Sequence, residues 1–168
     1  GIRNKVYEQM KKDFLNIYGY KEIFLWYNLE KIDILKPQDN SNFYNDANKK
    51  LQLIFDNIDI NEPNDTSYVY NGYSPITIRL IEKAISQGWI SSKDLLKKIP
   101  GDTDFPADES ELFNSSVNKQ FILLVFVGGI TYGELAAIRY LNKKNRNKKF
   151  IILTTGIINY KSIFDSLK

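Results

Sequence analysis

The stretch that decides the fold is FILLVFVGGITYGELAAIRYLNKKNRNKKFIILTT, residues 121–155. The continuous apolar run at 121–127 is typical of a strand buried on both faces of a parallel sheet, and 150–153 repeats this pattern. The sequence between them has helical periodicity, so we predict a parallel, right-handed crossover. Two such strands cannot form a stable sheet alone. Since the chain holds no further candidate strand, we expect the missing strands to come from sequence upstream of residue 1.

The turns around these strands carry their own signals. Gly128 and Gly129 turn the chain, Thr131 with Glu134 three residues later forms a capping-box pattern, and Asn159 is placed to cap a final helix. The two glycines could also hold a phosphate at a helix N-terminus. However, neither Gly-x-Gly-x-x-Gly spacing nor a following Gly-Lys-Ser/Thr is present. A tight turn is therefore the favoured interpretation, and a small α/β nucleotide-binding module or enzyme using this loop is the alternative function.

The first hundred residues are expected to be entirely helical. Gly19 is placed to end the first helix and Pro37 stops the second, while Ser74 and Pro75 supply a cap and first position for the fourth. The fourth helix has an isoleucine face made of Ile78, Ile81 and Ile85. Apolar residues recur at helical spacing over residues 4–18, 20–35, 42–58, from 75 to near 88, and over 92–99.

Composition excludes several classes of chemistry. The 168 residues contain no Cys and no His, which removes disulfides, cysteine zinc sites and the commonest general base. The net charge of +3 is too balanced to indicate a nucleic-acid or membrane partner. Glu134 has a capping role that already explains it. We therefore predict no catalytic, cofactor-binding or metal-binding residue, and the chain is not expected to be an enzyme.

Two charged stretches have ordinary explanations. Residues 101–118 hold five carboxylates among Gly, Pro, Ser and Asn, and we expect a mobile acidic loop, because nothing fixes these groups at cation-binding spacing. Residues 139–149 hold six basic residues as a helix ends, which complements the helix dipole. Neither stretch predicts a ligand.

A cluster of tyrosines precedes the fourth helix. Tyr68, Tyr70 and Tyr73 lie in a loop that enters the helix at Pro75. Tyrosine supplies stiff, amphipathic contact area that suits protein interfaces. Packing of these rings within the helical part explains them equally well, so both interpretations stay open.

The start of that helix is the candidate partner-binding site. At about 100° per residue, Ile76 falls roughly 160° from Ile78 and so outside the isoleucine face. We expect Ile76 to be an exposed anchor beside Tyr73, with Arg79 as a charge at the rim. The predicted partner-binding residues are Tyr73, Pro75, Ile76 and Arg79.

Four stretches carry a family resemblance: residues 18–36 (YGYKEIFLWYNLEKIDILK), 61–85 (NEPNDTSYVYNGYSPITIRLIEKAI), 126–141 (FVGGITYGELAAIRYL) and 150–167 (FIILTTGIINYKSIFDSL). Together they resemble the C-terminal portion of the SM (Sec/Munc-type) proteins, regulators of SNARE-driven membrane fusion, and in particular its vacuolar branch. The resemblance covers nearly the whole chain in order. The region 101–118 has no counterpart pattern.

The resemblance implies a mixed α and β fold. Residues 1–100 would be the final helical part of SM domain 3, and residues 101–118 the acidic loop. Residues 119–168 would be the β-α-β-α segment of the parallel-sheet SM domain 2, whose other strands lie outside this chain. This agrees with the incomplete sheet expected from the residues themselves.

The resemblance also implies a non-enzymatic role without cofactors. The chain would dock a helical subunit of a HOPS- or CORVET-type tethering complex, of the vacuolar protein sorting-associated protein 16 type. SNAREs would bind parts of the parent protein absent here, and neither nucleic acid nor direct membrane insertion is expected. The implied location is cytoplasmic and peripheral on endosome, lysosome or vacuole membranes, in the service of vesicle-mediated protein transport.

Overall fold

The computed structural model describes residues 2–37, 43–59, 61–97, 102–104 and 120–167, which belong to two compact units. One unit combines residues 2–37 with 158–167, and the other runs from 43 to 157. Every helix in these ranges is too short or too polar to span a lipid bilayer. Apart from residues 102–104, the predicted acidic loop lies outside the described ranges. The domain boundaries expected around it stay a prediction.

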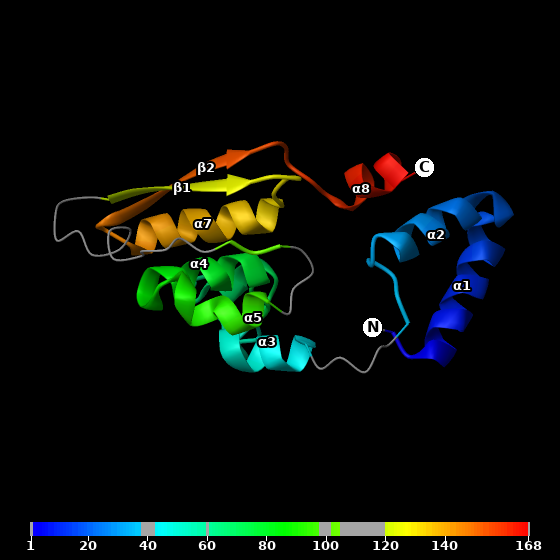
Figure 1. The fold of residues 1–168 in the computed structure, drawn as a ribbon, viewed down its shortest axis with the longest axis horizontal. Helices are drawn as coiled ribbons and strands as arrows, with labels where there is room; N and C mark the ends of the chain where they lie inside the picture. The colour runs from blue at the N-terminus through cyan, green and yellow to red at the C-terminus, as the bar shows by residue number, and fades with distance from the viewer. Residues whose placement is uncertain (1, 38–42, 60, 98–101, 105–119, 168) are drawn as a thin grey trace. The chain divides into compact units, whose positions relative to one another are not determined.

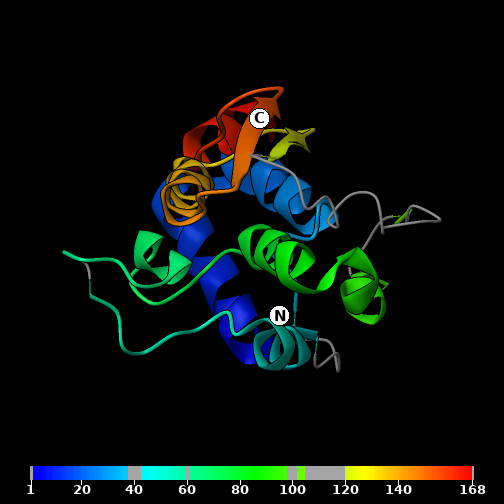
Figure 2. The same cartoon turned by 90° about the vertical axis from the view of Figure 1, so that its left-hand side faces the viewer.

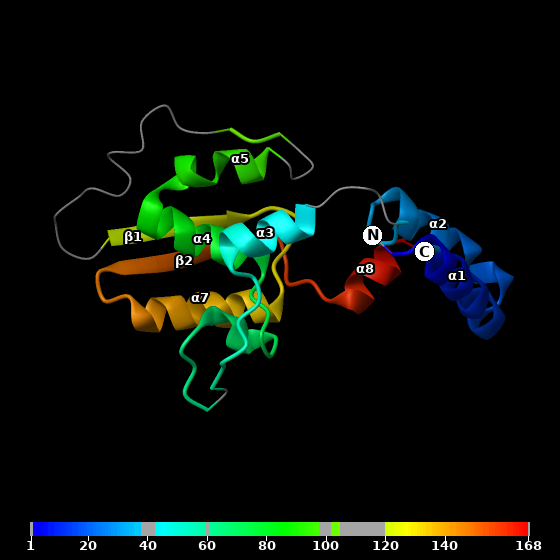
Figure 3. The ribbon, with the colours of Figure 1, turned by 90° about the horizontal axis from the view of Figure 1, so that it is seen from below.

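The first unit consists of α1 (Asn4–Tyr18), the short η1 (Tyr20–Glu22), α2 (Ile23–Lys31) and α8 (Tyr160–Leu167). Its core contains Tyr7, Leu25, Trp26 and Leu29. The last helix joins it from the far end of the chain, since Asn28 Nδ2 donates a hydrogen bond to the carbonyl oxygen of Leu167 at 2.8 Å. Helical segments far apart in the sequence thus complete one unit (Figure 3).

Helix α1 has the predicted bounds and ends at Gly19, whose φ is 86°. Helix α2, however, ends at Lys31 rather than near Leu35. Asp33 has a φ of 61°, and the amides of Ile34 and Leu35 both donate to the carbonyl of Leu29. Aspartate tolerates this left-handed conformation, so the chain leaves the helix before Pro37 is reached.

Within its described residues, the second unit contains two parallel strands, β1 (Gln120–Phe126) and β2 (Lys148–Thr154), joined by α7 (Tyr132–Lys144). Figures 1 and 2 show the strands side by side, and in Figure 1 α7 runs along one face of the pair. Thr131 and Glu134 form the predicted capping box. Asn159 caps α8 by accepting a hydrogen bond from the amide of Ser162 at 2.9 Å. The order strand–helix–strand–helix is therefore confirmed.

Among the described residues, the helical part of the second unit contains α3 (Phe43–Leu51), η2 (Thr66–Val69), α4 (Ile76–Gln87), η3 (Trp89–Ser92) and α5 (Lys93–Leu96). The helix predicted over 42–58 is too long. The chain turns at Gln52, with a φ of 52°, and then pairs with the segment before α4: Phe55 N donates to Gly72 O and Ser74 N to Leu53 O. These backbone bonds replace the helical ones that the apolar spacing indicated.

Helix α4 lies between two apolar clusters. On one side, Ile78 and Ile81 pack with residues of α7 and β2, and Ile85 adds to this cluster, so the predicted isoleucine face is confirmed. On the other side, Leu80 packs in a second cluster with residues of α3 and α5. Figure 3 shows α3 beside α4. Two of its faces are thus used inside the unit.

Candidate partner-binding site

Three of the four predicted site residues lie at the start of α4. Tyr73, Pro75 and Ile76 are each half-buried, and both Tyr73 and Ile76 pack against the second apolar cluster. The expectation that Ile76 is exposed is therefore wrong. The helical projection identified the face toward α7, but α3 and α5 cover a second face that no local periodicity shows. Tyr73 and Ile76, three residues apart, both pack on this cluster and both retain partial exposure.

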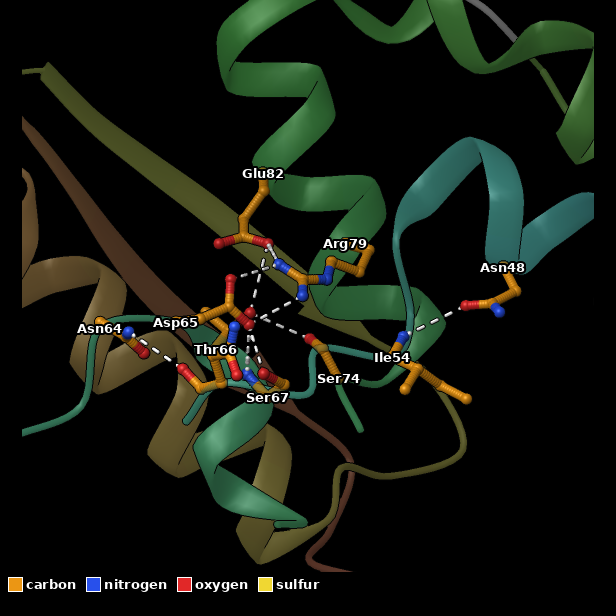
Figure 4. A network of polar contacts seen from close by, with 10 residues as sticks. Asn48, Ile54, Asn64, Asp65, Thr66, Ser67, Ser74, Arg79 and Glu82 are labelled. Carbon is orange, nitrogen blue, oxygen red and sulfur yellow. Dashed lines mark hydrogen bonds and ion pairs between the residues drawn. The ribbon is translucent and has the colours of Figure 1, made fainter. Parts of the chain in front are cut away.

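The prediction that Arg79 is a charge at the rim is also wrong. Its exposed fraction is 8%, so it is no rim charge but a buried ion-pair residue. Figure 4 shows its guanidinium pointing at two carboxylates. Nη1 and Nη2 donate to the two carboxylate oxygens of Asp65 at 2.9 and 2.8 Å, and Nη1 also donates to Glu82 Oε2 at 2.8 Å. The fork-shaped pairing with Asp65 fixes direction as well as distance.

The electrostatics of this cluster follow from burial opposed by pairing. Burial alone would raise the pKa of Asp65, but the hydrogen bonds from Arg79 and Ser67 outweigh it and hold the pKa below its usual range. Burial disfavours the charged guanidinium, yet hydrogen bonds to Asp65 and Glu82 raise the pKa of Arg79 above its ordinary value. Asp65 and Arg79 are therefore both charged at neutral pH. Arg79 Nε is buried without a hydrogen-bond partner among the described residues, as is Ser92 Oγ outside this cluster.

Hydroxyl groups extend this network into the loop. Ser74 is not the helix cap predicted for it: its Oγ lies 3.0 Å from Thr66 Oγ1, and Thr66 in turn donates to Glu82 at 3.2 Å. Pro75 occupies the cap position, and its carbonyl accepts the first helical bond, from Arg79 N at 3.1 Å. The network (Figure 4) therefore ties the loop 65–74 to α4 and sets the place at which Tyr73 and Pro75 enter the helix.

The tyrosines before α4 pack mainly on α7. Tyr68 donates to the carbonyl of Ala136 at 3.3 Å, and its ring centroid lies 5.6 Å from that of Tyr140. Tyr70 OH lies 3.3 Å from Thr131 Oγ1. Intramolecular packing therefore accounts for Tyr68 and Tyr70. Tyr73 is the member of the cluster that packs at the start of α4.

The second face of the sheet is open. Along β1 the exposure alternates, so that Ile122, Leu124 and Phe126 pack toward α7 while the residues between them point away. The described part of the chain leaves this outward face uncovered, although the apolar run indicated burial on both faces. The outward residues, each more than half exposed, are Phe121, Leu123, Val125, Ile151 and Leu153.

The glycine turn after β1 has little capacity for a phosphate. Gly128 and Gly129 have φ values of 98° and 113°, as a tight turn requires. Gly128 N donates to Thr155 Oγ1 at 3.0 Å, so this amide is already engaged. Glu134 accepts bonds from both Thr131 and Thr77, and no cluster of metal-ligating side chains occurs within the described ranges. The local geometry fits the tight-turn interpretation.

Asp65 and Glu82 are the site residues that sequence reasoning missed. Glu82 follows Arg79 by three residues, a spacing at which helical side chains meet. Asp65 precedes Ser67 by two, the spacing of an Asx turn, and it does accept from Ser67 N at 2.9 Å. These two signals, taken with an arginine next to the isoleucine face, could have indicated a buried pair.

Comparison with known proteins gives a consistent result. A model described as the Sec1 family matches residues 1–166. The vacuolar protein-sorting-associated protein 33 homolog of Arabidopsis thaliana is 33% identical, over 99% of this chain and 30% of its own length. Vacuolar protein sorting-associated protein 33A of Rattus norvegicus is 34% identical, over 99% of this chain and 29% of its own length. The 33A protein of Drosophila melanogaster is also 34% identical, over 99% of this chain and 30% of its own length. The chain thus spans about 30% of the length of these relatives.

Proposed function

The chain belongs to the Sec1 family, and from this premise we propose that it is the C-terminal part of an SM protein that acts in vacuolar or endolysosomal protein sorting by regulating vesicle tethering and fusion. The observation that carries the proposal is identity of 33–34% over 99% of the chain to relatives named for vacuolar protein sorting. SNAREs would bind parts of the parent protein outside these residues. Its place would be cytoplasmic, peripheral on endosome, lysosome or vacuole membranes.

The open sheet supports the proposed domain assignment. We propose that β1 and β2 complete an α/β domain with strands from elsewhere in the parent protein, as SM domain 2 requires, and that residues 1–100 end the helical domain 3. An apolar face of this size in water favours association. Strands and a helix from the same protein would cover it and pair the free strand edges.

The start of α4 is the proposed docking surface for a helical subunit of the vacuolar protein sorting-associated protein 16 type, in a HOPS- or CORVET-type complex. Tyr73, Pro75 and Ile76 would contact this partner through their exposed portions. Arg79 would act through the loop, because its ion pairs fix where Tyr73 stands. Such pre-ordered side chains lose little conformational freedom on binding.

The proposed role is non-enzymatic and uses no cofactor. The alternative, a nucleotide-binding module at Gly128 and Gly129, has little support from a turn whose Gly128 amide already bonds to Thr155. A thermal-shift measurement with ATP and GTP separates the two. No shift is expected, whereas a saturable shift that Gly129→Val abolishes would favour the alternative.

A chimera tests the general function. In cells that lack their own relative of this protein, a chimera in which these residues replace the C-terminal third of that relative should restore vacuolar protein sorting. The unmodified relative is the positive control. Failure of a well-expressed, folded chimera would contradict the proposal.

Binding of the helical subunit tests the docking surface. A pull-down should show loss of the partner with Ile76→Lys, because an ammonium would be buried at the interface. Ile17→Lys on α1, where the isoleucine is 73% exposed, is the matched control and should bind normally. Since Ile76 also packs against the second cluster, circular-dichroism melts are needed. Tyr73→Ala provides a second variant, and retained binding by both folded variants would refute the assignment.

A further inference from the structure

A groove of about 880 Å³ lies between α7 and the loop that precedes η2. Arg139, Lys143 and Lys144 of α7 line one side, together with Tyr140, while residues 61–64 and Tyr68 line the other. All of these residues belong to the second unit. The volume falls within the range typical of ligand sites. Neither the glycine turn nor the proposed docking surface at the start of α4 includes any of them.

The charge of the groove is strongly positive on the α7 side. Arg139, Lys143 and Lys144 make no ion pair with a carboxylate in the part of the chain that the structure describes. The facing loop contributes one carboxylate, Glu62. Like charges spaced four apart on a helix, as in Arg139 and Lys143, are destabilising. An anionic ligand would relieve this repulsion.

The helix dipole explains only part of this arrangement. Lys143 and Lys144 lie in the last turn of α7, where cations are favoured. Arg139 lies in the preceding turns, where the dipole provides no comparable gain. A guanidinium can form paired hydrogen bonds with a carboxylate, yet Arg139 has no carboxylate partner within the described residues.

The walls of the groove are held in place. The Tyr68 hydroxyl bonds to the Ala136 carbonyl, and the Tyr68 and Tyr140 rings pack at 5.6 Å. The loop is fixed by its own bonds, since Asp59 Oδ1 accepts from the amides of Asn61 and Glu62 at 2.8 and 3.1 Å. A groove ordered in this way offers a tyrosine surface for an apolar side chain next to three cations, at low entropic cost.

We propose that this groove binds an extended acidic segment of a partner protein, with carboxylates on Arg139, Lys143 and Lys144 and an apolar or aromatic side chain on Tyr68 and Tyr140. The groove has α7 on one side and residues 61–64 on the other, so an extended peptide can enter it and contact both walls. A flat anionic membrane would reach only the exposed cations and would not contact the surface formed by Tyr68 and Tyr140.

Fluorescence anisotropy with the full chain and a short labelled peptide of alternating Asp and Glu around one Phe tests the proposal. The variant Arg139→Glu/Lys143→Glu should weaken binding at least about tenfold, since it places like charges against the peptide. The control Lys5→Glu/Lys12→Glu makes the same charge change on exposed positions of α1 and should bind like the unmodified protein. Binding should also weaken with salt.

Two further arms separate the groove from simple charge attraction. Tyr140→Ala should weaken the Phe-containing peptide but not one with Gly in place of Phe. Vesicles of phosphatidylcholine with phosphatidylserine should not displace the peptide. Equal losses in both charge-reversal variants, no effect of Tyr140→Ala, or displacement by the vesicles would each overturn the proposal. Circular dichroism should show that the variants, all at exposed or half-buried positions, remain folded.

Discussion

Replacing Arg79 by Met tests how far the loop 65–74 depends on the buried ion pairs. Methionine keeps most of the packed side-chain volume, so the loss is electrostatic and no large cavity forms. Removing one partner of a fully buried pair costs about 3–5 kcal/mol, and an exposed pair contributes about 0–1. The carboxylate side chains here are 20% and 27% exposed and can take up water. We therefore expect a loss of about 2–3 kcal/mol, near the lower end of the buried range.

Thermal melts followed by circular dichroism measure this loss. For a unit of this size, 2–3 kcal/mol corresponds to a fall in Tm of roughly 6–12 °C. Asp65→Asn keeps the oxygen that caps Ser67 but removes the charge, so a double-mutant cycle with Arg79→Met isolates the ion pair. A fall below about 1 kcal/mol for Arg79→Met would show that the pair behaves as an exposed one.

The pH dependence gives an independent check. The pKa of Asp65 is lowered in the folded protein, so its charged form contributes stability that is fully present above the unfolded pKa of about 3.9. This contribution disappears as the pH falls through the lowered folded value. The unmodified protein should therefore lose stability below about pH 4, and Arg79→Met should show a smaller loss there. An unchanged slope would refute this reasoning.

Three other changes have definite expected outcomes. Gly133→Ala places a Cβ against the ring of Tyr70, so thermal melts should show no gain in stability. In a Tyr70→Ala background, the higher helix propensity of alanine should raise the free energy of unfolding by about 0.5–1 kcal/mol. Thr131→Ala removes the cap of α7 and should lower the free energy of unfolding in urea by about 1 kcal/mol. The isolated chain should self-associate through its open sheet face, and light scattering should show less association for Leu123→Ser/Val125→Thr; a monomeric unmodified chain would contradict this.

The elements that sequence predicted well are those fixed by neighbours in the chain. Thr131 and Glu134 satisfy each other across three residues, and Gly19 and Gly128 adopt the positive φ their positions require. The strands follow from uninterrupted apolar runs. In each case the residues that specify the structure lie within one turn or strand of each other.

The predictions are wrong where residues far apart in the sequence determine the local structure or burial. Arg79 was expected at a rim because its partner Asp65 lies on a separate loop, and Ile76 was expected to be exposed because α3 and α5 cover a face of α4 that periodicity does not show. Likewise the helix predicted over 42–58 is too long, because Leu53 forms a backbone hydrogen bond with Ser74 in place of a helical one. Local spacing placed the candidate site at the start of α4 as a position in the chain, and its role in partner binding stays a prediction. Its chemistry required the tertiary structure.

The unit that combines α1 and α2 with α8 has a consequence for synthesis. Asn28 bonds to the carbonyl of Leu167, a separation of 139 residues. A ribosome that adds about 5–20 residues per second needs roughly 7–28 s to make the intervening chain. During that interval α1 and α2 must remain without their third helix while the second unit emerges and begins to fold. The nascent chain therefore exposes the incomplete apolar surface of α1 and α2 to chaperones for seconds, and a ribosome that stalls before α8 is made would leave that surface uncovered.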